Sequence, residues 1–209
     1  MFLTRVELDL EKSKTKRGLV NPNMFHACIA KICDPMDRDS AERRYLWRVD
    51  DLNGKKYILV LTPEKPDMSP FIDEFGKAGT VAETKPYEKL LERTKNYTNW
   101  FFRLPANPSK YEKETKKRKA LCDFDSQMDW LIRKGKQNGF MVIRSTVAIQ
   151  PMDTIRFFKS DRTTLVQIPA VTYSGVLRIT DETAFKTALT RGVGRGRGYG
   201  LGMLTVIKA

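Results

Sequence analysis

The sequence predicts an α+β protein made of two consecutive domains. The first observation is the order of its segments, in which strand, helix and further strands are followed by a second series of the same kind. The second is the length of 209 residues, which suits one large domain or two small ones. The third is a hydrophobic content of 41% with three tryptophans, which excludes global disorder. Two tandem ferredoxin-like (split βαβ) domains are the simplest interpretation. With a boundary near Asn96, they span residues 1–95 and 96–209.

The first half of the chain places a helix between strands. Asn21 before Pro22 is typical of a helix start, and Asn53-Gly54 between two apolar runs indicates a hairpin turn. We therefore predict, in chain order, a half-buried strand at Met1–Leu10, a basic loop at Glu11–Gly18, a helix to about Cys33, strands at Arg43–Val49 and Lys56–Leu61, a short helix or structured loop at Asp67–Phe75, and a segment open between strand and helix at Thr84–Thr94.

The second half begins with the apolar run Trp100–Leu104, which Pro105 and Pro108 are expected to end. The remaining predictions rest on apolar periodicity and on capping residues. They are a solvated basic loop at Lys110–Lys119, a helix at Asp125–Lys136, a strand at Phe140–Ile149, a hairpin of Ile155–Phe158 and Thr163–Ile168, a strand at Tyr173–Ile179, a helix from Thr180 to about Leu189, and a closing strand at Met203–Ile207.

Positive charge is concentrated in the second half. Residues 1–105 carry 19 basic and 16 acidic side chains and residues 106–209 carry 19 and 9, so the net charge of +13 divides into +3 and +10. This local excess indicates an anionic partner, with nucleic acid the leading candidate and a membrane surface the second. The sequence has no long apolar segment and no basic amphipathic helix with an aromatic face, which argues against the membrane.

A glycine occupies every second position from Gly192 to Gly202, a pattern that no packed core requires. Glycines let backbone amides approach a ligand, and Arg195 and Arg197 add guanidinium groups, so the run suits a phosphate backbone. A flexible low-complexity tail is the alternative. The apolar residues that follow at once, Met203–Ile207, favour a loop held between ordered elements.

His26 is the only histidine, so acid–base chemistry that needs a group titrating near neutrality depends on it. At about 100° per residue, it lies at the edge of the apolar stripe of its helix. The stripe consists of Phe25, Cys28, Ile29, Ile32 and Cys33. Position alone favours an ordinary boundary histidine.

The sequence offers no candidate metal site. It has one histidine, three cysteines without a CxxC spacing and no tight carboxylate cluster, so we expect neither a metal nor another cofactor. The odd number of cysteines argues against disulfides and favours a reducing cytoplasm, and strand-like residues from Met1 onward predict no targeting peptide. RNA cleavage without a metal would use the ribose 2′-hydroxyl as nucleophile, with a base, an acid and stabilising cations.

Gly192-Val-Gly194 and, after five residues, Gly200-Leu-Gly202 resemble the GhGxxxxxGhG loop (h, hydrophobic) of repeat-associated RNA-binding CRISPR proteins. Earlier segments narrow the resemblance: the N-terminal strand, Met24–Cys28 with its histidine, Tyr45–Val49, Phe101–Lys110 and Ser174–Asp181. In this order, and over almost the whole chain, they are similar to the CasE family of CRISPR repeat endoribonucleases of the type I-E interference complex.

The resemblance implies tandem ferredoxin-like domains and a metal-independent endoribonuclease. Such proteins bind the stem-loop of the CRISPR repeat in precursor RNA and cut at the 3′ base of the stem, leaving a 5′-hydroxyl and a cyclic phosphate. They then stay on the guide RNA with the other subunits of the complex. His26 matches the family's helix histidine, the general acid–base, and Lys31 a basic residue that some members place near the scissile phosphate. Asn23 stands where some members have a tyrosine.

The turn Lys159–Arg162 matches the basic hairpin that members of the family place in the major groove of the RNA stem. That groove is deep and narrow, so a thin hairpin suits it better than a helix. We therefore expect RNA contacts from Arg156, Lys159, Arg162, Arg195 and Arg197.

Three interpretations stay open beside these expectations. Tyr199 is open between base stacking and core packing, and Lys110–Lys119 between non-specific attraction of RNA and solubility. The alternative function is a non-catalytic RNA-hairpin-binding subunit with a structural His26, which Asn23 slightly favours. A general nucleic-acid-binding regulator lacks any helix-turn-helix or zinc signature.

Overall fold

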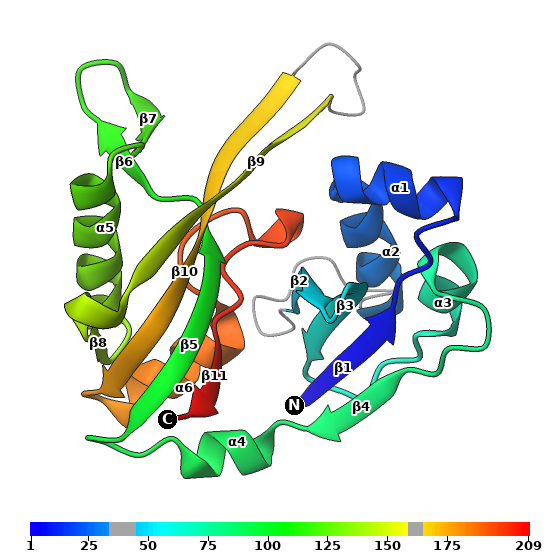
Figure 1. Ribbon diagram of the computed structural model, residues 1–209, viewed down its shortest axis with the longest axis horizontal. Coiled ribbons are helices and arrows are strands. Elements are labelled where there is room, and N and C mark those ends of the chain that lie inside the picture. The colour runs from blue at the N-terminus through cyan, green and yellow to red at the C-terminus, as the bar shows by residue number, and fades with distance from the viewer. Residues whose placement is uncertain (34–44, 159–164) are drawn as a thin grey trace. The chain divides into compact units, whose positions relative to one another are not determined.

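The computed structural model describes residues 1–33, 45–158 and 165–209, and the chain divides into two compact units. The first unit comprises Met1–Leu91, Arg156–Val166 and Gly198–Gly200. The second comprises Glu92–Ile155, Gln167–Arg197 and Leu201–Ala209. Each combines helices with antiparallel strands, as Figure 1 shows.

The first unit has the topology of a ferredoxin-like fold. Its four strands form an antiparallel sheet in the order β2-β3-β1-β4, with the first and third strands in the centre. The elements are β1 (Phe2–Glu7), α1 (Ser13–Val20), α2 (Asn23–Cys33), β2 (Leu46–Leu52), β3 (Lys55–Thr62), α3 (Ser69–Phe75) and β4 (Glu83–Pro86), followed by α4 (Glu88–Arg93).

The helices of the first unit cover one face of its sheet. Phe25 of α2 lies at the centre of their shared core, with an exposed fraction of 1%. Its ring meets Phe71 and Phe75 of α3 at centroid distances of 5.7 and 4.9 Å, and Trp47 of β2 edge-on at 6.0 Å. Aromatic packing of this kind fixes α2, and with it the residue after Phe25, relative to the sheet.

The prediction of a loop at Glu11–Gly18 was wrong, because Ser13–Val20 form α1. The buried positions of this helix are Thr15 and Gly18 rather than large apolar residues, so the sequence shows no apolar period. A Cβ at Gly18 would come within 2.5 Å of the Phe25 ring, and the Thr15 hydroxyl donates to the carbonyl of Phe75 over 3.0 Å. Small side chains thus let α1 pack closely against α2 and α3.

The second unit repeats the ferredoxin-like topology, with its sheet in the order β11-β5-β10-β8 and β9 paired to β10. The predicted fold class is therefore confirmed. The elements are β5 (Asn99–Ala106), β6 (Ser109–Glu112), β7 (Lys117–Ala120), α5 (Phe124–Gln137), β8 (Phe140–Val142), the 3-10 turn η1 (Arg144–Thr146), β9 (Ala148–Phe158), β10 (Leu165–Ile179), α6 (Glu182–Arg191), η2 (Arg197–Tyr199) and β11 (Thr205–Lys208).

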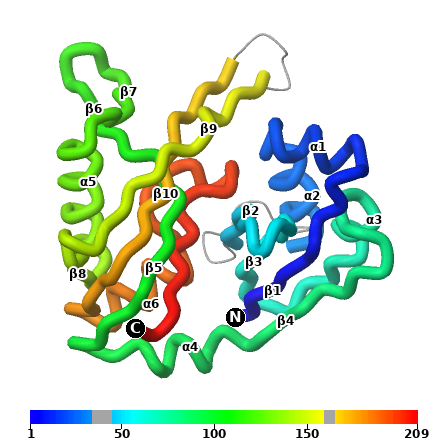
Figure 2. Tube along the Cα trace, in the orientation of Figure 1, coloured from blue at the N-terminus to red at the C-terminus, as the bar shows by residue number. Residues whose placement is uncertain are grey.

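The core of the second unit joins α5 and α6 to its sheet. Trp130 of α5 stacks on Tyr173 of β10 at 5.8 Å, and the Tyr173 hydroxyl donates to the backbone carbonyl of Gln127 over 3.0 Å. Phe140 and Phe185 make an edge-to-face contact between β8 and α6. β9 pairs with β10, and Figure 2 shows the traces of these two strands running side by side.

Several predicted boundaries change. The strand at Trp100 continues through Pro105 to Ala106, because β11 pairs only with Trp100–Arg103 and requires no N–H from the proline. Lys110–Lys119 is not a loop but lies in the β6–β7 hairpin, whose backbone pairing its charged composition does not reveal. Phe140–Ile149 contains η1 between two strands, and Thr84–Thr94 contains β4 and then α4.

Candidate functional site

His26 occupies the second turn of α2. The helix begins as predicted, since the Asn21 side chain accepts a hydrogen bond from the N–H of Asn23 (3.2 Å) and Pro22 supplies the carbonyl that accepts from the N–H of His26. His26 follows the buried Phe25 and is itself only partly buried. The ring is thus anchored by the core while one edge remains accessible.

Tyr45 holds the His26 ring from the side. Its hydroxyl oxygen lies 3.1 Å from Nδ1 of His26, and the two rings are tilted by 33° with centroids 5.6 Å apart. A hydrogen bond at Nδ1 selects the role of the other ring nitrogen, because the tautomer follows from that partner. The sequence did not identify Tyr45 as a site residue.

The second half of the glycine run lies against the other side of His26, within the same unit. A Cβ at Gly198 would lie 3.4 Å from Nε2 and 3.5 Å from Cε1 of His26. A side chain larger than a methyl group at this position would cover Nε2. The glycine therefore keeps the ring nitrogen opposite Tyr45 open to a ligand.

The neighbouring loop residues are packed in place. Tyr199 contacts Phe157 of β9, with ring centroids 5.0 Å apart, and its side chain stays partly exposed. A Cβ at Gly200 would meet the Trp47 indole at 3.0 Å, and five of the six glycines have positive φ angles between 76° and 84°. The alternating pattern thus reflects alternating left-handed backbone in a closely packed loop. The flexible-tail alternative is wrong.

Burial lowers the pKa of His26 below its ordinary value. Desolvation is the cause, because burial disfavours the charged imidazolium and so favours the neutral imidazole. The ring is therefore ready to accept a proton at neutral pH.

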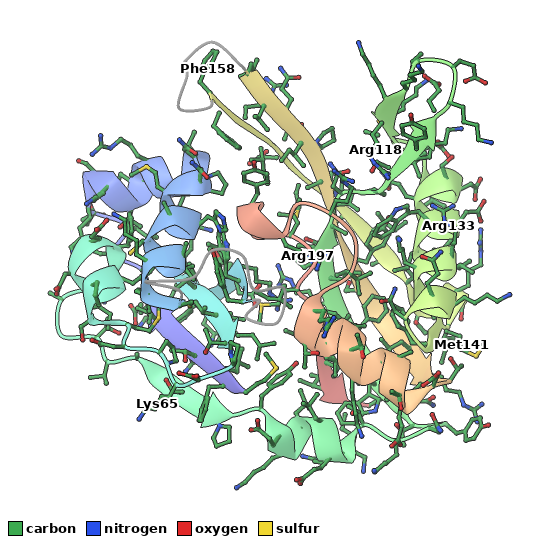
Figure 3. The ribbon with its side chains drawn as sticks, turned by 180° about the vertical axis from the view of Figure 1, so that it is seen from behind. Lys65, Arg118, Arg133, Met141, Phe158 and Arg197 are labelled. Atoms are coloured by element: carbon green, nitrogen blue, oxygen red, sulfur yellow. The ribbon has the colours of Figure 1, made fainter. Side chains whose placement is uncertain are left out.

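Within the part of the chain that the structure describes, the contacts that hold the His26 ring involve none of the other predicted site residues. Lys31 is exposed in the last turn of α2, five residues after His26. Arg156 is exposed on β9 beside Phe157, and Arg195 is exposed in the glycine run. Arg197, labelled in Figure 3, donates to the backbone carbonyl of Arg191 over 2.7 Å and so caps α6. Lys159 and Arg162 lie outside the described residues.

The described ranges contain no group of three or more His, Cys, Asp and Glu side chains arranged to hold a metal ion. Within the same ranges, no helix is long and apolar enough to cross a membrane.

Tyr45, Trp47 and Phe157 are the residues that the sequence did not reveal as parts of the site. Tyr45 is 19 positions from His26, and Phe157 of β9 contacts Tyr199 of η2. Contacts over such separations have no periodic signal, so only the tertiary structure reveals them.

Comparison with known proteins gives consistent matches over the full length. The family model described as CRISPR associated protein matches residues 1–208. The CRISPR-associated endoribonuclease Cse3 of Thermus thermophilus is 31% identical over 216 residues, covering 99% of both chains.

Two solved structures are similar throughout. CRISPR endoribonuclease Cse3 bound to a 19-nucleotide RNA has a TM-score of 0.84 and 29% identity, with 99% of this chain and 100% of that chain covered. Thermus thermophilus Cse3 bound to an RNA representing a pre-cleavage complex has a TM-score of 0.81 and 26% identity, with 99% and 98% covered.

Proposed function

This chain belongs to the CRISPR-associated protein family, and from that premise we propose that it is a metal-independent endoribonuclease that processes CRISPR precursor RNA. It binds the repeat stem-loop, cuts at the 3′ base of the stem, and remains on the guide RNA as a cytoplasmic subunit of the type I-E interference complex. One observation carries the proposal. The only histidine of the chain is held by Tyr45 at Nδ1 and faces a glycine at Nε2.

The geometry supports a proton-transfer role for His26. When Nδ1–H donates to the Tyr45 oxygen, Nε2 keeps its lone pair and accepts the proton of the ribose 2′-hydroxyl. The 2′-oxygen attacks the adjacent phosphorus, the bond from phosphorus to the 5′-oxygen breaks, and the imidazolium returns its proton to that oxygen. The products are a cyclic phosphate and a 5′-hydroxyl.

Cations stabilise the negative charge that builds on the phosphorus in this step. Arg195 is exposed in the glycine run, three positions before the glycine that faces His26, and we assign this role to it. Lys31, exposed in the last turn of α2, contributes more weakly. The stem is held by Arg156, Lys159 and Arg162 of the basic hairpin, and Arg197 fixes the glycine run. In this scheme, residues 1–95 supply the histidine, and residues 96–209 supply the hairpin and glycine run, of which Arg156–Val166 and Gly198–Gly200 belong to the same compact unit as His26.

Cleavage of labelled repeat RNA in excess chelator tests this function. We expect one cut at the 3′ base of the stem, and an RNA with a 2′-deoxy sugar at that position should bind with unchanged affinity but resist cleavage. Cleavage of the deoxy substrate would exclude the 2′-hydroxyl mechanism. Binding without any cleavage of the normal RNA would leave the non-catalytic RNA-hairpin-binding subunit.

Tyr45→Phe tests whether Tyr45 positions the catalytic ring. The variant keeps the aromatic contact with His26 and loses only the hydroxyl, so we expect kcat to fall about tenfold while KM and the melting temperature stay within error. Tyr45→Leu is the matched control, and it should lose stability as well, because it also removes the ring. An unchanged kcat in Tyr45→Phe would show that the hydrogen bond at Nδ1 has no role in the reaction.

A further inference from the structure

A second basic surface lies in the second unit, on the β6–β7 hairpin and the exposed side of α5. We define this hairpin–α5 surface as Tyr111, Arg118, Arg133 and Lys134. Figure 1 shows the hairpin at one end of α5, and Figure 3 labels Arg118 and Arg133 on these two elements. None of the four residues belongs to the candidate site around His26.

The register of the hairpin brings an aromatic ring and a guanidinium together. Tyr111 pairs directly with Arg118, so their side chains share one face of the two-stranded sheet. Tyr111 is 54% exposed, and Arg118 is exposed beside it. On the opposite face Lys110 pairs with Lys119 and Glu112 with Lys117, so this face also carries an excess of positive charge.

Lys134 of α5 lies near basic side chains of both α5 and the hairpin. Burial lowers the pKa of its ammonium group, and the nearby charges of Arg133 and Arg118 lower it further. Among the described residues, Arg118, Arg133 and Lys134 form no ion pair; Lys134 donates only to the neutral Gln137 side chain, over 3.0 Å. Among the described residues of these elements, Asp125 binds Arg144, Glu112 accepts a hydrogen bond from the Thr115 hydroxyl, and Asp129 forms no ion pair with Arg133 one turn later.

A site of three unneutralised cations beside an exposed aromatic ring suits a nucleic-acid strand better than an acidic protein surface. Phosphates neutralise the cations, while the Tyr111 ring provides a stacking face for an unpaired base. The bases of an intact stem cannot stack in this way, because they are already stacked on one another.

We propose that the hairpin–α5 surface binds the phosphodiester backbone of an unpaired strand that flanks the repeat stem-loop. The inference depends on the proposed function only for the identity of the RNA. The hairpin–α5 surface is a second point of attachment. It increases the affinity for precursor RNA and takes no part in cleavage.

The test compares the triple variant Arg118→Gln/Arg133→Gln/Lys134→Gln with wild type. Lys65→Gln/Lys89→Gln/Lys208→Gln is the matched control, since it removes the same charge from exposed lysines elsewhere. The probes are the repeat stem-loop alone, the stem-loop with about 12 unpaired nucleotides on either side, and unstructured oligouridylate RNA. Affinity is measured as a function of salt, and melting temperatures verify that both variants are folded.

In wild type, we expect the extension to tighten binding about tenfold. The triple variant should lose this gain and bind the stem-loop alone as wild type does. For the extended RNA, the slope of log affinity against log salt concentration should be smaller by about 2, at roughly 0.7 for each phosphate that the variant no longer neutralises. The control variant should keep the gain. An extension that adds nothing in wild type, or a triple variant that loses equal affinity for the bare stem-loop, would overturn the proposal.

Two further measurements complete the test. One distinguishes a DNA strand from an RNA strand as the ligand, and the other distinguishes this proposal from the proposed function. Competition by single-stranded DNA of the same sequence would support recognition of the shared backbone, whereas competition by RNA alone would support a ribose-containing strand. Cleavage by the triple variant at saturating RNA should equal that of wild type. If wild type binds the extension but cuts no RNA, the proposed function fails while the hairpin–α5 surface stands.

Discussion

His26→Ala is expected to lower the rate of repeat RNA cleavage by about 10²–10⁴-fold, the usual contribution of a general acid–base. Affinity for the stem-loop should stay within about threefold of wild type, because the ring is only partly buried and the RNA-binding cations lie elsewhere. Single-turnover cleavage and equilibrium binding, measured with the same RNA, separate these effects. His26→Asn is the matched variant that keeps a polar group in the place of the ring.

The pH profile provides a second test of the same residue. Burial lowers the pKa of His26, so the neutral base persists to a lower pH than in a free histidine. We therefore expect kcat/KM of wild type to decline on the acidic side with an apparent pKa below about 6.5, the ordinary value for histidine. Residual activity of His26→Ala should lack this decline. If His26→Ala cut the RNA at the rate of wild type, the assignment of the histidine would be wrong.

Gly200→Ala is expected to destabilise the first unit by about 2–4 kcal/mol and to reduce cleavage at least tenfold. Left-handed backbone costs a residue with a Cβ roughly 1–2 kcal/mol, and φ at Gly200 is 78°. The added methyl group would also lie 3.0 Å from the Trp47 ring, which is 2% exposed and packed edge-on against Phe25, so little room exists for adjustment. The strain should displace Gly198 from its place beside His26.

Gly54→Ala is the matched control for this prediction. Gly54 has φ of 74°, almost the same as Gly200, but no atom lies within 4 Å of the place that an added methyl group would take in the β2–β3 turn. It should cost only the backbone strain, about 1 kcal/mol, and leave cleavage unchanged. Thermal unfolding and single-turnover kinetics of the two variants distinguish the contributions. Equal losses in both would show that the packing of Gly200 on Trp47 has no special role.

Features with a clear signal in a few adjacent residues were predicted correctly, and features that depend on residues far apart in the sequence were not. The start of α2 at Asn21 and the β2–β3 turn at Asn53-Gly54 depend on a few adjacent residues, and both were predicted correctly. The helix α1 was missed because its buried residues, Thr15 and Gly18, are selected by the partner surface rather than by hydrophobicity. The β6–β7 hairpin was missed because five of the eight residues in its strands are charged, a composition typical of a solvated loop.

The same distinction holds for the candidate site. His26, as the only histidine, and the glycine run were evident from residue type and spacing alone, and the order of motifs was sufficient to identify the family. The sequence by itself determined the fold class, the proposed chemistry and the residue expected to perform it. Only the tertiary structure decided that Tyr45 bonds Nδ1, that Gly198 faces Nε2, and that Arg197 caps α6. These contacts depend on the packing of whole elements, which brings together residues that no local pattern connects.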